Sequence, residues 1–183
     1  MDIIVITKPD LFEGETDICN KLFADGLKRL HLRKPDATRE QLAEWIERIE
    51  PPFRCRIVLH DHHALALKYG LGGIHINKRN PRPTSSDGLS LSRSCHSIEE
   101  VEVCQNDFDY VFLSPIFDSI SKQGYKAAFT KEELEKARSI LSKNVYALGG
   151  ITFENLPEVE RLGFRGAAML GGYWSHFFPK TEK

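Results

Sequence analysis

The stretch Leu91-Ser92-Arg93-Ser94-Cys95-His96-Ser97 starts as an apolar strand and gives way to hydroxyl groups, a cation and an imidazole, just before a segment of helical period begins. Two other stretches break off from apolar strands in the same way, namely Leu30-His31-Leu32-Arg33-Lys34 and Leu59-His60-Asp61-His62-His63. In barrels of alternating strands and helices, the active site lies at the carboxyl ends of the strands. These three strand ends therefore predict one shared pocket.

Eight short apolar segments alternate with segments of helical period along the chain. Each is too brief and too uniformly apolar for a surface helix, as expected of parallel strands that are buried on both faces. The predicted strands are residues 3–7, 30–33, 56–59, 73–76, 89–92, 110–113, 145–148 and 166–170. The repeat predicts an α/β protein with the fold of a TIM (β/α)8 barrel. An open, doubly wound sheet is the alternative, because alternation alone does not prove that the sheet closes.

Helices are predicted between these strands from apolar stripes and capping residues. Residues 15–25 are predicted to form a helix whose apolar stripe consists of Ile18, Leu22 and Phe23. Residues 38–50 are predicted to form a second helix, whose stripe consists of Leu42, Trp45, Ile46 and Ile49. Capping residues predict three further helix starts, at Ser97, at Thr130 with Glu133 three residues later, and at Thr152.

Two features predict that the barrel is trimmed. Residues 77–87 contain three prolines and no apolar stripe, so the helix after the fourth strand is expected to be lost, and only a short tail follows Leu170. The chain has 183 residues, whereas such barrels typically have about 250. This length allows one sizeable core and requires no second domain, so residues 1–183 are predicted to form a single barrel domain.

The composition excludes some classes of binding partner and predicts the cellular compartment of the protein. The formal net charge is −1, with 25 basic and 26 acidic residues, which argues against nucleic acid or an acidic membrane surface recognised by bulk charge. No apolar run approaches the length of a membrane span. The four cysteines are far apart and form no CxxC pair, which favours reduced thiols in a cytoplasmic protein.

Cations, hydroxyls and glycine amides at the strand ends indicate a phosphorylated ligand. Gly149-Gly150 and Gly171-Gly172 follow the seventh and eighth predicted strands, where barrels often bind phosphate through backbone N–H groups. A plain tight turn is the alternative for each pair. Ser119, Ser121 and Lys122 follow the sixth strand, and their hydroxyls and ammonium suit a diphosphate, although their spacing alone slightly favours a solvated loop.

The histidines differ in what their positions predict. His96 stands at a helix start beside hydroxyl groups and is the predicted general acid or base, since imidazole titrates near neutral pH. His75 alternates within a strand, where it either lines the barrel or contacts a ligand. His62, His63 and His176 are predicted to be surface residues.

Together these motifs resemble the thiamine-phosphate synthase and TenI family over nearly the whole chain. The resemblance rests on Leu30-His31-Leu32-Arg33-Lys34, Leu59-His60-Asp61, Gly73-Ile74-His75-Ile76, Ser94-Cys95-His96-Ser97, Ser114-Pro115-Ile116-Phe117, Lys122-Gln123-Gly124 and Ala147-Leu148-Gly149-Gly150-Ile151. It implies a β/α barrel enzyme of thiamine biosynthesis that binds small phosphorylated substrates. In its synthase branch, a hydroxymethylpyrimidine diphosphate is joined to a thiazole phosphate, and diphosphate is released with the help of Mg²⁺.

The resemblance also implies roles for individual residues. Arg33, Lys34, Ser94 and Lys122 would hold diphosphate, with Arg33, Lys122 and His96 as the catalytic residues. Asp61 would hold the metal. The amides of Gly149, Gly150, Gly171 and Gly172 would hold the thiazole phosphate, and Ser119 and Ser121 stand where the family usually has threonines.

Three departures from the synthase pattern open a second possibility. His31 replaces a glutamine and His60 an asparagine among the predicted substrate-binding residues, and Asn80 replaces a second metal-binding aspartate. Because Mg²⁺ prefers charged oxygens, this change is expected to weaken the metal site. The alternative is the TenI branch, which isomerises a carboxythiazole phosphate without a metal, with a histidine matching His96 as the proton shuttle. A non-catalytic phosphate-binding module is the third interpretation, and the trimmed helices leave room for a homodimer.

Overall fold

The computed structural model describes residues 1–83, 86, 88–118 and 126–177. Its parallel strands follow one another in sequence order and close into a barrel, which confirms the predicted fold. The strands are β1 (Asp2–Ile6), β2 (Leu30–Leu32), β3 (Ile57–Leu59), β4 (Gly73–Ile76), β5 (Ser90–Cys95), β6 (Tyr110–Leu113), β7 (Val145–Leu148) and β8 (Gly166–Met169).

Helices follow most of the strands. They are α1 (Glu15–Ala24), α2 (Arg39–Glu47), α3 (Ala64–Tyr69), α4 (Ile98–Cys104), α5 (Lys131–Lys136), α6 (Arg138–Asn144), α7 (Leu156–Leu162) and α8 (Gly171–Phe177), with the 3-10 turns η1 (Pro51–Arg56) and η2 (Gln105–Asp107). The described residues between β4 and β5 contain no helix. The expectation that only a short tail follows Leu170 is wrong, because residues 171–177 form α8, in which Tyr173 and Trp174 are buried.

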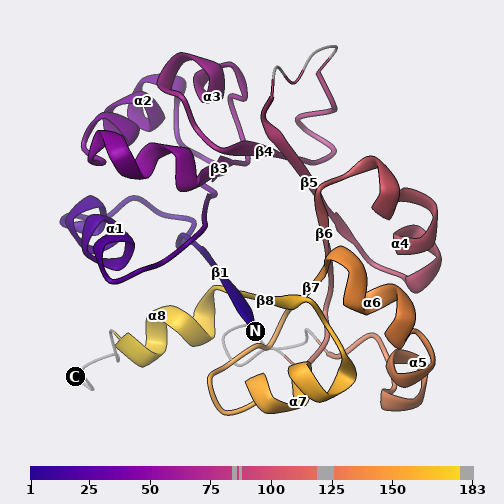
Figure 1. Cartoon of the computed structure of the whole chain (residues 1–183). Coiled ribbons are helices and arrows are strands. Elements are labelled where there is room, and N and C mark those ends of the chain that lie inside the picture. The colour runs from indigo at the N-terminus through magenta and orange to yellow at the C-terminus, as the bar shows by residue number, and fades with distance from the viewer. Residues whose placement is uncertain (84–85, 87, 119–125, 178–183) are drawn as a thin grey trace. The chain divides into compact units, whose positions relative to one another are not determined.

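The chain divides into two compact units, which we call the N-terminal unit (residues 6–92) and the C-terminal unit (residues 1–5 and 93–183). In the N-terminal unit, β2 pairs with β3 through Leu30 and Ile57, and β3 pairs with β4 through Val58 and Gly73. The helices α1, α2 and α3 belong to this unit, and their labels lie outside its strands in Figure 1.

Helix α2 forms as its sequence predicts. Thr38 and Gln41 make a reciprocal capping box, which satisfies backbone N–H groups at the helix start. The predicted stripe of Leu42, Trp45, Ile46 and Ile49 is buried. In α1 only Phe23 of the predicted apolar stripe is fully buried, and it is joined by the small side chains of Cys19 and Thr16.

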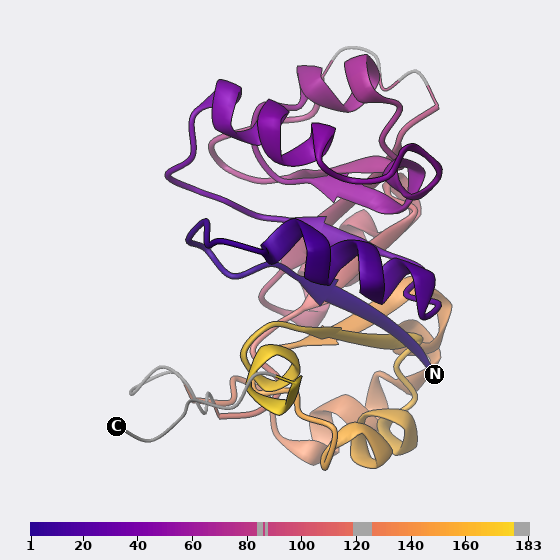
Figure 2. The same ribbon diagram turned by 90° about the vertical axis from the view of Figure 1, so that its left-hand side faces the viewer.

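In the C-terminal unit, β6, β7 and β8 pair in parallel, and β1 pairs with β8 (Figure 2). Ser97 caps α4, and Thr130 with Glu133 forms a capping box at α5, as predicted. The predicted cap at Thr152 is wrong. Helix α7 begins after Asn155, whose side chain accepts a hydrogen bond from the Thr152 backbone N–H at 2.9 Å.

Strand β5 runs further than predicted. It extends from Ser90 to Cys95, so Arg93 and Ser94 lie within the strand and do not follow its end. The alternation of polar residues explains the difference, because Ser92 is fully buried and contacts His75, while Arg93 and Ser94 are only half-buried. A serine in the sequence does not show whether its hydroxyl is buried inside a strand or lies at the end of the strand.

Candidate active site

Arg33 lies directly after β2 and is held by the end of β1. Its backbone N–H donates to the Thr7 hydroxyl at 2.9 Å, and that hydroxyl donates to the Arg33 carbonyl at 3.2 Å. The Arg33 side chain is half-buried, and its guanidinium has no ion pair among the described residues. A fixed backbone with an uncommitted guanidinium suits the binding of an anion.

Lys34 has a different environment. Its ammonium is fully buried and donates to the carbonyl oxygens of Lys8 and Asp10 at 2.8 and 2.7 Å and to the Glu15 carboxylate at 2.7 Å. These three acceptors use all three N–H donors of the ammonium. The structure therefore gives Lys34 a role in fixing the loop after β1, in place of the predicted contact with diphosphate.

Glu15 completes this buried network. Its second carboxylate oxygen accepts a hydrogen bond from the Trp45 indole at 2.9 Å. Burial raises the pKa of Glu15, and burial likewise lowers the pKa of Lys34. A buried ion pair is retained when hydrogen bonds satisfy its remaining groups, and this one has them.

Asp61 lies just beyond β3 and is almost completely buried. Its Oδ1 accepts from the Arg79 guanidinium at 3.0 Å and from the Asn80 amide at 2.7 Å. Its Oδ2 is buried and has no hydrogen-bond partner among the described residues. Since an unsatisfied buried carboxylate oxygen is costly, this atom is suited to a metal ion or to a donor on a ligand.

Asn80 does not fit the predicted role of second metal ligand. Its amide nitrogen faces Asp61 Oδ1 and also donates to the carbonyl oxygen of His60 at 3.2 Å. A metal ion would need the amide oxygen on that side. Asn80 and Arg79 thus stabilise the Asp61 carboxylate by donation. Arg79 was missed in the sequence, although it lies inside the stretch that carries Asn80.

His31 and His60, which were predicted to bind substrate, contact each other inside the N-terminal unit. His31 Nδ1 and His60 Nε2 are 2.8 Å apart, and His75 stacks on His60 with ring centroids 4.2 Å apart. Exposed fractions of 0%, 6% and 3% for His31, His60 and His75 place all three rings in the core. The predicted surface position of His63 is wrong, because its ring is half-buried and its Nε2 is fully enclosed.

His96 lies in the C-terminal unit directly after β5 and is exposed. Its Nδ1 is 3.1 Å from the carbonyl oxygen of Ser114, which follows β6. A carbonyl oxygen only accepts, so Nδ1 carries the proton and the neutral ring keeps its lone pair on Nε2. This is the arrangement that a general base needs.

The two glycine pairs meet in the same unit. Gly149 and Gly150 have positive φ angles of 93° and 66° and lie against the segment after β6, where a Cβ on Gly150 would come within 2.4 Å of the Asp118 carbonyl oxygen. A Cβ on Gly172 would lie 2.2 Å from the carbonyl oxygen of Ile151, the residue that follows Gly150. Only glycine permits both backbone approaches.

Contacts thus connect four strand ends of the C-terminal unit. The Ser114 carbonyl that holds His96 precedes Pro115, and a Cβ on Gly149 would lie 2.8 Å from the Pro115 Cα. The structure therefore brings together His96, Gly149, Gly150 and Gly172. Ser94 is half-buried within β5, and Gly171 opens α8. Ser119, Ser121 and Lys122 lie outside the described residues.

Comparison with known proteins identifies the family. The sequence profile described as thiamine monophosphate synthase matches residues 3–172. The chain belongs to this family. A thiamine-phosphate synthase of Synechococcus sp. (strain CC9605) is 32% identical over 142 residues, which cover 74% of this chain and 40% of that protein. The chain thus spans less than half of that relative's length.

Two further relatives match over most of their length. Thiamine-phosphate synthase 1 of Aquifex aeolicus (strain VF5) is 27% identical over 184 residues, covering 94% of this chain and 85% of that protein. The crystal structure of thiamine phosphate pyrophosphorylase from Bacteroides thetaiotaomicron is 39% identical, covers 100% of this chain and 89% of that chain, and has a TM-score of 0.88. The resemblance inferred from the strand-end motifs is confirmed.

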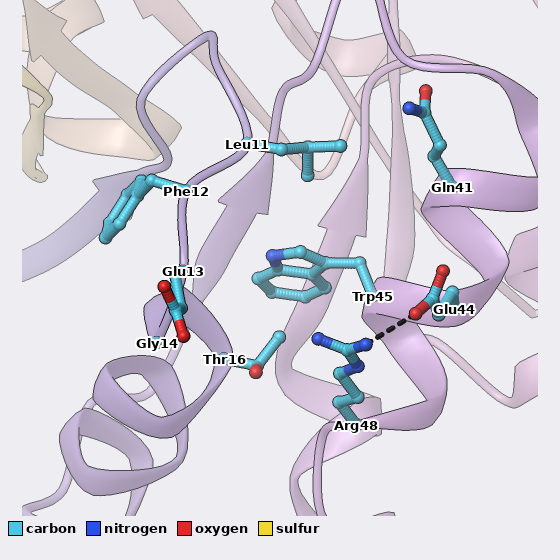
Figure 3. A pocket seen from close by; sticks show the side chains of 9 residues that line it. All are labelled: Leu11, Phe12, Glu13, Gly14, Thr16, Gln41, Glu44, Trp45 and Arg48. Atoms are coloured by element: carbon cyan, nitrogen blue, oxygen red, sulfur yellow. Dashed lines mark hydrogen bonds and ion pairs between the residues drawn. The ribbon is translucent and has the colours of Figure 1, made fainter.

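A separate pocket of about 380 Å³ lies between the start of α1 and α2 (Figure 3). The Trp45 ring faces the loop that carries Leu11, and Arg48 pairs with Glu44 at the edge. No residue predicted for the site lines this pocket. It is therefore distinct from the predicted substrate site.

Proposed function

We propose that the protein is a thiamine-phosphate synthase, which joins hydroxymethylpyrimidine diphosphate to thiazole phosphate and releases diphosphate. The contacts that link His96, through the segment after β6, to the two glycine pairs carry this proposal, because backbone amides at these strand ends suit the phosphate of a small substrate. The family match over residues 3–172 supports an enzyme of this type.

In this reaction the C–O bond to diphosphate breaks, and the thiazole nitrogen bonds to the pyrimidine methylene carbon. Arg33, with its uncommitted guanidinium, would neutralise the departing diphosphate together with Ser94 and Lys122. Gly149, Gly150, Gly171 and Gly172 would hold the thiazole phosphate. Lys34 is left out of this set, because its donors are used inside the protein.

Mg²⁺ fits one of the two residues predicted for it. Asp61 Oδ2 offers one charged oxygen, whereas Asn80 presents its amide nitrogen. Mg²⁺ in other proteins is often held by one or two carboxylates together with substrate phosphates. When bound there, the ion would supply further charge neutralisation of the diphosphate.

A second candidate function is the metal-independent isomerisation of a carboxythiazole phosphate. The fixed tautomer of His96 favours it, since Nε2 is ready to accept a proton. The engagement of Asp61 by Arg79 and Asn80 also favours it, because these donors already offset the carboxylate charge without a metal.

One set of assays separates the two functions. We expect Mg²⁺-dependent formation of thiamine phosphate and diphosphate from both substrates, reduced at least about 100-fold in Asp61→Asn and unchanged in the exposed control Asp36→Asn. Isomerisation that needs no metal, and that is lost in His96→Ala but kept in Asp61→Asn, would replace the synthase proposal by the tautomerase. If calorimetry shows that thiazole phosphate binds but neither reaction occurs, the protein would be a non-catalytic binding module.

We also propose that the protein forms a homodimer, because the connection after β4 leaves one flank without a described helix. Light scattering on the purified protein tests this proposal. Among the described residues, no helix has the length and apolar character needed to span a bilayer. The cytoplasmic location expected from the cysteine pattern stays a prediction.

A further inference from the structure

The three buried histidines of the N-terminal unit form a compact cluster of ring nitrogens. His31 comes from β2, His60 from the end of β3 and His75 from β4, and one nitrogen from each lies within 4.8 Å of the other two. Four-coordinate Zn²⁺ holds its nitrogen ligands at about 2.0–2.1 Å, which places them about 3.4 Å from one another. Shifts on the order of 1 Å would bring the three nitrogens to these positions.

Hydrogen bonds prepare His75 as a ligand. Its Nδ1 is 2.9 Å from the Ser92 hydroxyl, and this hydroxyl donates in turn to the carbonyl oxygen of Ile74 at 3.4 Å. A hydroxyl has one proton, so it accepts from His75 Nδ1–H and leaves the lone pair on Nε2. An N–H fixed by a neighbouring oxygen is the usual outer partner of a metal-binding imidazole.

The contact between His31 and His60 also suits a metal. One of the two facing nitrogens now carries the proton of their 2.8 Å hydrogen bond. Metal binding would require that this ring carry its proton on the other nitrogen, so that both lone pairs face the ion. Both rings are buried, and burial disfavours the charged imidazolium, which cannot bind a metal.

We propose that His31, His60 and His75 bind a divalent transition metal ion of the Zn²⁺ class. Three imidazoles on adjacent strands are the ligand set of an ion with a fourth position left for water or a substrate atom. This site differs from the proposed Mg²⁺ contact, which uses a carboxylate oxygen and not an imidazole. Neither proposal depends on the other.

The test uses the full chain without an affinity tag, freed of metals with a chelator and titrated with Co²⁺. We expect one equivalent to bind with the visible absorption of four-coordinate Co²⁺ and to be displaced by Zn²⁺. His31→Gln, His60→Asn and His75→Gln each remove one ligand, so each is expected to weaken Co²⁺ binding at least about 100-fold. Ser92→Ala removes only the outer partner and is expected to weaken it about tenfold.

His176→Gln, in the C-terminal unit, is the matched control and is expected to bind Co²⁺ as the wild type does. X-ray absorption of the wild-type Zn²⁺ complex tests the same site without any variant, and we expect three imidazole nitrogens at about 2.0 Å. Absence of Co²⁺ binding by the wild type, equal binding by the three ligand variants, or a Zn²⁺ shell without imidazole would overturn the proposal.

Discussion

At the scale of single residues, the buried ion pair of Lys34 and Glu15 is expected to stabilise the fold. Glu15→Gln keeps the size of the side chain but leaves the Lys34 ammonium buried without a counter-charge. We expect a loss of about 3 kcal/mol in the free energy of unfolding, measured by urea denaturation. The exposed neighbour Glu13 is the control, and Glu13→Gln is expected to stay within about 0.5 kcal/mol. Equal stability of the two variants would refute the structural role.

His31 and His60 predict how stability depends on pH. Their pKa values are lowered in the folded protein, so below the ordinary value of 6.5 the unfolded chain binds more protons than the folded one. Their contribution to stability is therefore present above pH 6.5 and is lost as the pH falls below it. We expect the melting temperature to fall on the order of 3 °C per pH unit for each histidine between pH 6 and 5.

The double variant His31→Gln/His60→Asn isolates this effect, since it removes both titrating groups. Its melting temperature is expected to change less with pH than that of the wild type over the same range. Parallel pH profiles for the two proteins would show that the buried histidines do not cause the acid sensitivity.

Lys34 shows why side-chain roles were only partly predictable. It follows His31 and Arg33 in a motif that resembles an anion site, and nothing in that motif distinguishes an exposed ammonium from a buried one. The distinction depends on Glu15, and the loop after β1 brings Glu15 to Lys34 only in the folded chain. The pairing of Asp61 with Arg79 escaped prediction for the same reason.

At the scale of elements, Gly150 can be compared with Gly70. Both have positive φ angles, 66° and 63°, but a Cβ on Gly70 would meet nothing within 4 Å, whereas one on Gly150 would collide with two carbonyl oxygens. Gly70→Ala is expected to cost only the conformational strain, about 1 kcal/mol. Gly150→Ala must also move the segment after β6, so we expect the KM for thiazole phosphate to rise at least about tenfold. A KM unchanged in Gly150→Ala would remove this loop from the phosphate site.

Elements were predictable where apolar residues follow one period. Strands β4, β6 and β7 have the predicted bounds, and the stripe of α2 is buried as expected, because their buried apolar residues follow one period. Strand β5 contains the buried Ser92, and its predicted end was wrong. Helix α8 was missed because seven residues with two initial glycines give too short a pattern, and only burial of Tyr173 and Trp174 reveals it.

At the scale of the whole molecule, the reactivity of the cysteine thiols measures how well the core is shielded from solvent. Cys55 is exposed, whereas Cys19, Cys95 and Cys104 are buried, and burial with the nearby Cys104 raises the pKa of Cys95 to about 12. We therefore expect a disulfide reagent at pH 8 to modify one thiol per native chain quickly. The remaining thiols are expected to react only in denaturant. Loss of the fast reaction in Cys55→Ser is the control, and a second fast thiol would contradict the described burial.

The pairing of β1 with β8 has a consequence for how the protein is made. Asp2 to Val5 emerge from the ribosome long before their partners, Gly166 to Met169, because more than 150 residues separate the two strands in the sequence. Until then the outer edge of β1 has backbone groups with no parallel neighbour on that side, and such edges invite association with other chains. Translation that stops before β8 would therefore leave a product prone to aggregation, and cells would depend on chaperones to shield the edge of β1 until β8 has been made.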